Sequence, residues 1–140
     1  MTRDGKVNPD RNQLYGLSQL NSFAQATIDN TLAFLLDHDQ NLASNAAQFI
    51  NAFFLQSSTG MNPRLDWGQT VRGPSQHGSY MGVLDFRVLV KVVNAIQILR
   101  LSRSSHWSKD RDTRMVTWAK SYLEWLETSE VGKRPKKSVK

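Results

Sequence analysis

Polar and aromatic side chains gather between residues 56 and 83, and their chemistry is that of a sugar-binding site. An indole ring can stack on the apolar face of a sugar, while amides and a guanidinium orient hydroxyl and carboxylate groups. The alternative is that Trp67 and Tyr80 anchor this segment to neighbouring helices while its polar groups satisfy the loop backbone. The candidate substrate-binding residues are Asn62, Trp67, Gln69, Arg72 and His77.

Proton transfer has two candidates in the same segment, although no residue is assigned as catalytic. His77 is a candidate general base because the ordinary pKa of an imidazole lies near neutrality; the alternative is a histidine that is simply exposed. Tyr80 is the second candidate. No metal is predicted, because His38 and His106 lie far apart in the sequence and nothing stands at metal-ligand spacing. The sequence also lacks GxGxxG, P-loop and GxSxG motifs, so no cofactor is predicted.

The elements that must position these residues are predicted to be helices. Apolar residues recur every three or four positions in four stretches, as they do along the buried face of an amphipathic helix. Ser108 is a predicted N-cap, Gly132 is predicted to end the last helix, and Pro135 is predicted to prevent its resumption. The expected fold class is all-α with negligible strand. The predicted helices cover residues 15–36, 40–55, 84–101 and 109–128.

Two connections indicate how these helices are arranged. The short link Asp37-His38-Asp39 implies that the first two helices form an antiparallel pair. Residues 56–83 have no periodicity and exceed the usual upper length of a loop, about 12 to 15 residues. Met61 and Leu65 make this segment too apolar for a linker, so it is predicted to be an ordered surface loop that carries the function.

Length and composition limit the class of protein. A chain of 140 residues with 39% hydrophobic positions suits one globular unit. No window approaches the roughly 18 uncharged apolar residues of a membrane helix, so no membrane contact is predicted. With 0 cysteines, neither a disulfide framework nor a thiolate site can form. The first six residues lack an apolar stretch behind their charges, so no secretory signal peptide is predicted and the localisation is left open.

The net charge of +6 is concentrated at the end of the chain. Five basic residues and no acidic residue stand among the last ten, which leaves +1 for the rest. A nucleic-acid binder would spread lysines and arginines along a row of phosphates, so nucleic acid is not a predicted partner. The run 133–137 is either a solvated tail or a nuclear address. The predicted organisation is a flexible segment over 1–14, a helical domain over 15–132 and a basic disordered tail over 133–140.

Several short motifs stand out over about residues 15–132. They are Phe53-Phe54-Leu55, Met61-Asn62-Pro63, Leu65, Trp67-Gly68-Gln69, Gly82-Val83-Leu84-Asp85 with Arg87, Trp107, Trp118, Tyr122-Leu123, Trp125-Leu126 and Thr128-Ser129. In the same order and spacing, these motifs resemble those of the alginate lyase family. That family carries a phenylalanine-phenylalanine-leucine helix end, then methionine-asparagine-proline, a leucine, and an aromatic-small-glutamine triplet. Its next helix opens on glycine-isoleucine-isoleucine-aspartate-threonine-arginine, and a later helix reads tryptophan, tyrosine-leucine, tryptophan-leucine, threonine-serine. The turns Arg72-Gly73-Pro74 and Gly78-Ser79-Tyr80 resemble fungal-type members.

The resemblance implies part of an incomplete α/α toroid of antiparallel helix pairs, and cleavage of a uronate polysaccharide by β-elimination. In that family an asparagine-histidine pair follows the threonine-serine helix end and takes part in catalysis. Here Thr128-Ser129 is followed by Glu130-Val131-Gly132 and a basic run instead. The resemblance therefore implies the N-terminal part of a lyase domain, truncated before its catalytic histidine and inactive as it stands.

The alternative function is a non-enzymatic helical module that binds an acidic glycan or a protein partner. A reading frame that continues past Lys140 into an asparagine-histidine segment would favour the lyase, whereas a stop at that point would favour the module. Truncation of a lyase domain would leave apolar faces exposed, which predicts marginal stability or self-association. A monodisperse monomer that unfolds cooperatively would instead favour the independent module.

Overall fold

Helices make up nearly all the regular structure of this computed structural model, which describes residues 15–71 and 77–137. Within those residues the sheet consists of two short paired strands, so the all-α fold class is confirmed. The predicted flexible segment, residues 1–14, lies outside the described residues. The elements in chain order are α1 (Tyr15–Asp37), α2 (Gln40–Ile50), the π-helical turn η2 (Asn51–Leu55), β1 (Thr70–Val71), β2 (His77–Gly78), α3 (Met81–Asp85), the 3₁₀ turn η3 (Phe86–Leu89), α4 (Val90–Leu101), α5 (Lys109–Thr128) and α6 (Glu130–Lys137).

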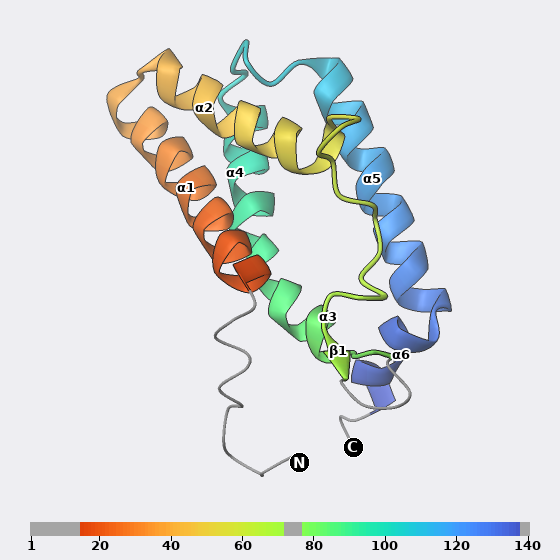
Figure 1. Cartoon of the computed structure of the whole chain (residues 1–140). Helices are drawn as coiled ribbons and strands as arrows, with labels where there is room; N and C mark the ends of the chain where they lie inside the picture. The colour runs from red at the N-terminus through yellow and green to blue at the C-terminus, as the bar shows by residue number, and fades with distance from the viewer. Residues whose placement is uncertain (1–14, 72–76, 138–140) are drawn as a thin grey trace.

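Helices α1 and α2 form the predicted antiparallel pair (Figure 1). His38 has a positive φ of 56° where the chain reverses between them. The Asp39 carboxylate then accepts a hydrogen bond from the Asn41 N–H at 2.8 Å, which caps the start of α2. The buried face of α2 consists largely of alanine, so neighbouring helices can approach its backbone closely.

The turn η2 (Asn51–Leu55) continues α2 with a wider hydrogen-bonding pattern. Its bonds span five residues instead of four, so one more residue is accommodated in the turn than an α-helix would hold. Phe53 stacks on Phe23 of α1, with ring centroids 4.2 Å apart. Phe54 makes an edge contact with Trp118 of α5, with centroids 4.6 Å apart. The turn therefore connects α2 to both α1 and α5.

The helix predicted over residues 84–101 begins earlier and is divided by a 3₁₀ turn. It begins at Met81 because Ser79 satisfies its first backbone N–H groups. The Ser79 hydroxyl accepts a hydrogen bond from Met81 N–H at 3.3 Å, and its carbonyl accepts one from Gly82 N–H at 3.2 Å. The turn η3 follows, with Phe86 buried, before α4 continues to Leu101.

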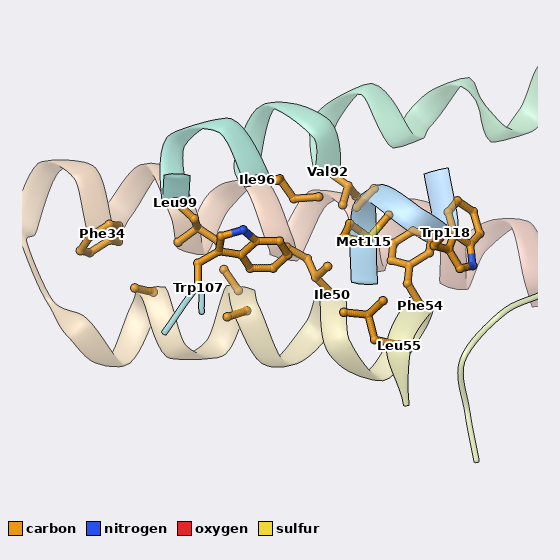
Figure 2. Close-up of a cluster of buried hydrophobic side chains, with 14 of the residues drawn as sticks. Phe34, Ile50, Phe54, Leu55, Val92, Ile96, Leu99, Trp107, Met115 and Trp118 are labelled. Atoms are coloured by element: carbon orange, nitrogen blue, oxygen red, sulfur yellow. The ribbon is translucent and has the colours of Figure 1, made fainter. Parts of the chain in front are cut away.

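The hydrophobic core lies where α1, α2, α4 and α5 converge, and Figure 2 shows the indole of Trp107 between α4 and α2. Trp107 comes from the link that precedes α5, so that link is part of the core. The buried residues of this core cluster are Ala24, Phe34, Ala43, Ala46, Ala47, Ile50, Phe54, Leu55, Leu65, Phe86, Val92, Ile96, Leu99, Trp107, Met115 and Trp118.

The structure confirms the predicted helix over 109–128, because α5 ends at Thr128, but it contradicts three predictions for the residues that follow. A further helix, α6, continues through Gly132 and Pro135, so neither residue stops the chain from being helical, and residues 133–137 belong to α6 instead of a disordered tail. Pro135 lies inside α6, where it removes one backbone hydrogen bond of a helix that ends shortly afterwards, at Lys137. Residues 138–140 lie outside the described residues.

Ser129 and Gly132 explain why a second helix follows. Ser129 is extended, with φ −76° and ψ 151°, and this separates α6 from α5. Its hydroxyl oxygen accepts a hydrogen bond from Gly132 N–H at 2.9 Å and so caps α6. A Cβ at Gly132 would lie 2.7 Å from the Cα and carbonyl oxygen of Leu126. The glycine therefore permits α6 to approach α5, and does not end a helix.

Large apolar side chains are exposed on α1 and α4. Leu36 is 78% exposed and Leu101 is 82% exposed. Such exposure favours the predicted self-association, which stays a prediction. None of the helices in residues 15–71 and 77–137 has the combination of length and apolar character needed to cross a membrane.

Asp112 links the end of α4 to the start of α5. Its carboxylate pairs with the Arg100 guanidinium and accepts a hydrogen bond from the Trp107 indole N–H at 2.8 Å. Burial alone raises the pKa of the Asp112 carboxyl, but the hydrogen bonds from Arg100 and Trp107, with the Arg100 charge, lower that pKa below its ordinary value. The folded chain therefore favours the ionised carboxylate.

We expect Asp112 to make the fold sensitive to acid. Because its pKa is lower in the folded than in the unfolded chain, its contribution to stability is complete above about pH 4 and is lost as the pH falls through the folded-state pKa. The measurement is the urea midpoint of unfolding as a function of pH. Asp112→Asn removes the charge, so the midpoint of this variant should fall less steeply than that of the wild type as the pH is lowered below about 4. Glu127→Gln, at an exposed position on α5, is the control. An acid limb that is unchanged in Asp112→Asn would contradict this assignment.

Candidate functional site

The loop between η2 and β1 runs beside α5 and is fixed to it at two points (Figure 1). The Trp118 indole N–H donates to the Met61 carbonyl oxygen at 2.7 Å. The Trp125 indole N–H donates to Oδ1 of Asp66 at 3.0 Å. These tryptophans are about two helical turns apart, so they lie on one face of α5. The predicted ordered loop is therefore confirmed for residues 56–71.

An aromatic ladder on α5 supports both contacts. The Tyr122 ring lies between the two tryptophans, with centroids 5.5 Å from Trp118 and 5.9 Å from Trp125 and ring planes within 22° and 17° of parallel. Burial raises the pKa of Tyr122 to about 12, so its hydroxyl stays protonated at neutral pH. Tyr122 supports the loop through its stacking on the two tryptophans that hold it.

Strands β1 and β2 return the loop toward α3. Their paired residues are Thr70 with Gly78 and Val71 with His77. Ser79 N–H donates to the Gln69 carbonyl oxygen at 2.7 Å, which extends the pairing. Gly78 lies directly on the Asp66 backbone, and a Cβ there would be 1.6 Å from the Asp66 carbonyl oxygen. This position therefore requires glycine for reasons of space.

A cavity of about 300 Å³ opens between the start of α1, η2, the loop and α3. The Trp67 side chain is 66% exposed at this cavity, and the Gln69 amide donates a hydrogen bond to the Asp85 carboxylate from α3. An exposed indole beside an amide and a carboxylate can stack on a sugar ring and orient its hydroxyl groups. The lining residues are Gly16, Leu17, Leu20, Phe53, Met61, Leu65, Trp67, Gly68, Gln69, Thr70, Gly82, Asp85 and Phe86.

A second hollow of about 570 Å³ adjoins the first, because Leu17 and Asp85 line both. Arg87 brings a guanidinium to this hollow and Asn21 brings an amide. We refer to the two hollows together as the groove. The groove thus combines an apolar wall with one cationic side chain, Arg87, and one carboxylate, Asp85, which lines both hollows.

The structure brings together two of the predicted substrate-binding residues. Trp67 and Gln69 both line the groove. Asn62 is exposed on the loop and His77 is exposed on β2, and neither is among the residues that line the groove. Arg72 lies outside the described residues.

Groups suited to proton transfer are not gathered at the groove. Tyr80 is partly buried just before α3 and, like His77, does not line either hollow. In the parts of the chain that the structure describes, no three histidine, cysteine, aspartate or glutamate side chains come close enough to hold a metal ion.

Sequence reasoning missed Asp85 and Arg87 as groove residues. The Asp85 carboxylate accepts a hydrogen bond from Gln69, which lies sixteen residues earlier in the sequence. The hydrophobic periodicity of the sequence does not indicate such a contact. Gly82 was the available signal, because a Cβ there would lie 2.9 Å from the Gln69 backbone nitrogen. A glycine at the start of a predicted helix indicates a close approach by another segment.

Comparison with known proteins gives one family. The family model described as alginate lyase matches residues 1–139. Among solved structures, the chain is similar to an alginate lyase from Bacteroides ovatus, with 28% sequence identity and a TM-score of 0.84. The match covers 94% of this chain and 34% of the solved chain, so this chain spans about a third of that lyase. No curated protein matches.

The structural match also bears on the fold. At a TM-score of 0.84, the described helices are arranged as in part of the solved lyase, which confirms the expected partial α/α toroid. The family match extends over the loop, the groove and both tryptophan contacts of α5. This chain belongs to the alginate lyase family.

Proposed function

We propose that this chain forms the polysaccharide-binding groove of an alginate lyase domain, and that its 140 residues do not complete β-elimination by themselves. The observation that carries the proposal is the Trp67 indole, exposed at the edge of the groove within a chain of this family. The ligand would be a uronate polysaccharide, which offers ring faces for stacking and carboxylates for a cation. We also propose that the chain is a fungal-type member, because the sequences Arg72-Gly73-Pro74 and Gly78-Ser79-Tyr80 resemble those of that group.

The described groove supplies some of the groups that a uronate requires. Trp67 would stack on one sugar ring, and the Gln69–Asp85 pair would orient its hydroxyl groups. Arg87 would attract the carboxylate of a neighbouring sugar, because its guanidinium lines the adjoining hollow. These are binding roles, and none of them removes a proton from carbon.

Elimination requires three further functions. One group must neutralise the sugar carboxylate so that the adjacent C–H becomes acidic, a base must remove that proton, and an acid must protonate the leaving oxygen. The 140 residues contain no asparagine-histidine pair of the kind that the family uses. Neither His77 nor Tyr122 lines the groove, and partial burial raises the pKa of Tyr122 to about 12. The chain therefore supports binding without a complete catalytic set.

We expect the chain to bind a mannuronate tetrasaccharide more tightly than cellotetraose, a neutral tetrasaccharide. Trp67→Ala should weaken that binding about tenfold or more, since covering an aromatic ring is worth at least about 1.4 kcal/mol. Phe49→Ala, which removes an exposed ring from α2 away from the groove, is the control. Isothermal titration calorimetry measures all four affinities. Equal affinity of wild type and Trp67→Ala would refute the proposed binding site.

We also expect no turnover by the 140-residue chain. General acid–base catalysis and electrostatic stabilisation each contribute about 10²-fold or more, so a chain that lacks both should release no detectable product. The measurement is the absorbance of unsaturated uronate after incubation with alginate, polymannuronate, polyguluronate or glucuronan. Activity that disappears in His77→Ala would show that His77 is the base and that the catalytic set is complete.

A further inference from the structure

We propose that Asp66 is a positioning residue, and that its hydrogen bond from Trp125 holds Trp67 in the orientation that stacks on a sugar. The proposal rests on the proposed function, because it assigns Trp67 as the sugar-binding ring. It adds a residue pair, Asp66 and Trp125, that neither touches the ligand nor lines the groove.

The donor of this hydrogen bond is held rigidly. Trp125 belongs to α5, and its ring stacks on Tyr122 with a centroid distance of 5.9 Å and planes within 17° of parallel. Its indole N–H reaches Asp66 Oδ1 at 3.0 Å across 59 positions of sequence. The other carboxylate oxygen, Oδ2, lies 3.8 Å from the Arg64 guanidinium. Both oxygens of Asp66 are therefore directed to groups of the protein.

The backbone of Asp66 is fixed from the opposite side. Gly78 packs against its carbonyl oxygen so closely that a Cβ would lie only 1.6 Å away. Just beyond, the Gly68 N–H donates to the Leu65 carbonyl oxygen at 3.2 Å, which forms a tight turn around Asp66 and Trp67. Because Trp67 follows Asp66 directly in this turn, fixing the backbone of Asp66 also fixes the direction in which the Trp67 side chain leaves the backbone.

Trp67 depends on this support because its own ring has few neighbours. At 66% exposure, packing against the rest of the protein cannot fix its orientation. A ring that is held before the ligand arrives loses less conformational freedom on binding, and so binds more tightly. The hydrogen bond from Trp125 to Asp66 restricts the orientation of the Trp67 ring, although neither residue of that pair lines the groove.

The first experiment follows the Trp67 ring in the free protein. The chain has 4 tryptophans, so a nitrogen–proton NMR spectrum gives one indole signal for each, and Trp67→Phe identifies the signal of Trp67. Trp125→Phe keeps an aromatic ring against Tyr122 but removes the donor, and Asp66→Ala removes the acceptor. Both should shift or broaden the Trp67 signal. Asp66→Asn keeps a side-chain oxygen that can accept, and should restore the wild-type signal.

The second experiment measures the affinity for the mannuronate tetrasaccharide. Trp125→Phe and Asp66→Ala should each weaken it about two- to tenfold, the range expected for one hydrogen bond. In a Trp67→Ala background neither change should weaken it further. Trp107→Phe removes an indole N–H that bonds Asp112 instead, and should leave both the Trp67 signal and the affinity unchanged.

The two experiments separate this proposal from the proposed function. An unchanged Trp67 signal in Trp125→Phe and Asp66→Ala would overturn the positioning role whether or not the chain binds sugar. Additive losses in the Trp67→Ala background would also overturn it, because the pair would then act on something else. If Trp67→Ala binds as wild type does, the proposed binding site fails while the NMR result still decides the positioning role.

Discussion

Replacing Trp118 with alanine is expected to lower the free energy of unfolding by about 3–5 kcal/mol, the range for removing a buried large aromatic side chain. The ring contacts Phe54 at 4.6 Å and Tyr122 at 5.5 Å between centroids, so its loss leaves a cavity between η2 and α5. It also removes the donor that holds the Met61 carbonyl. Against a typical domain stability of about 5–15 kcal/mol, such a loss is large.

Urea denaturation measures this change as a lower midpoint at an unchanged slope. Trp118→Phe separates the two contributions, because phenylalanine retains most of the ring packing but leaves Met61 without its indole donor. Its cost should be about 1–3 kcal/mol. Equal losses in the two variants would mean that the hydrogen bond, and not ring packing, dominates the role of Trp118.

Gly78→Ala is expected to disrupt the loop that carries Trp67. The added Cβ would stand 1.6 Å from the Asp66 carbonyl oxygen, and because the nearest atoms are all backbone atoms of Asp66, no side-chain adjustment can relieve the clash. Relief requires β2 to separate from the loop, at a cost near the upper end of the usual 1–3 kcal/mol for overpacking. We expect loss of tetrasaccharide binding together with a lower thermal midpoint.

Gly16→Ala is the matched control for the effect on stability only, because Gly16 itself lines the groove. A Cβ at Gly16 meets nothing within 4 Å, so the same chemical substitution there adds no clash. It should leave stability unchanged or slightly increased, because alanine favours a helix more than glycine does. Wild-type tetrasaccharide affinity in Gly78→Ala would show that the loop does not need this close contact.

The long helices could be predicted from the sequence because their signals are local. Helices α1 and α5 each repeat an apolar residue every three or four positions, and Ser108 caps α5 as predicted, with its hydroxyl oxygen 3.2 Å from the Arg111 backbone nitrogen. Helix α6 was missed because Gly132 and Pro135 have the composition of a helix end. Only the position of Leu126 shows that the glycine is there for close packing.

The candidate site was predicted only where one segment contained it. Trp67 and Gln69 lie near each other in sequence, and the structure places both at the groove. The contacts that fix them join Asp66 to Trp125 and Gln69 to Asp85. Such pairs are set by how helices pack, so residue type and spacing within one segment do not indicate them.

The π-helical turn η2 makes the groove sensitive to insertions and deletions in residues 51–55. With Ile50, Phe54 and Leu55 all buried, the wide turn keeps the core face of α2 continuous while Phe53 lines the groove. An in-frame deletion of one codon within residues 51–55 would allow a regular α-helix to form, and each later side chain would turn by about 100°. The helix would survive, but the aromatic wall of the groove would not. The shape of the groove therefore depends on the number of residues in this turn as well as on their identity, and an insertion or deletion here would alter ligand binding while leaving helix content unchanged.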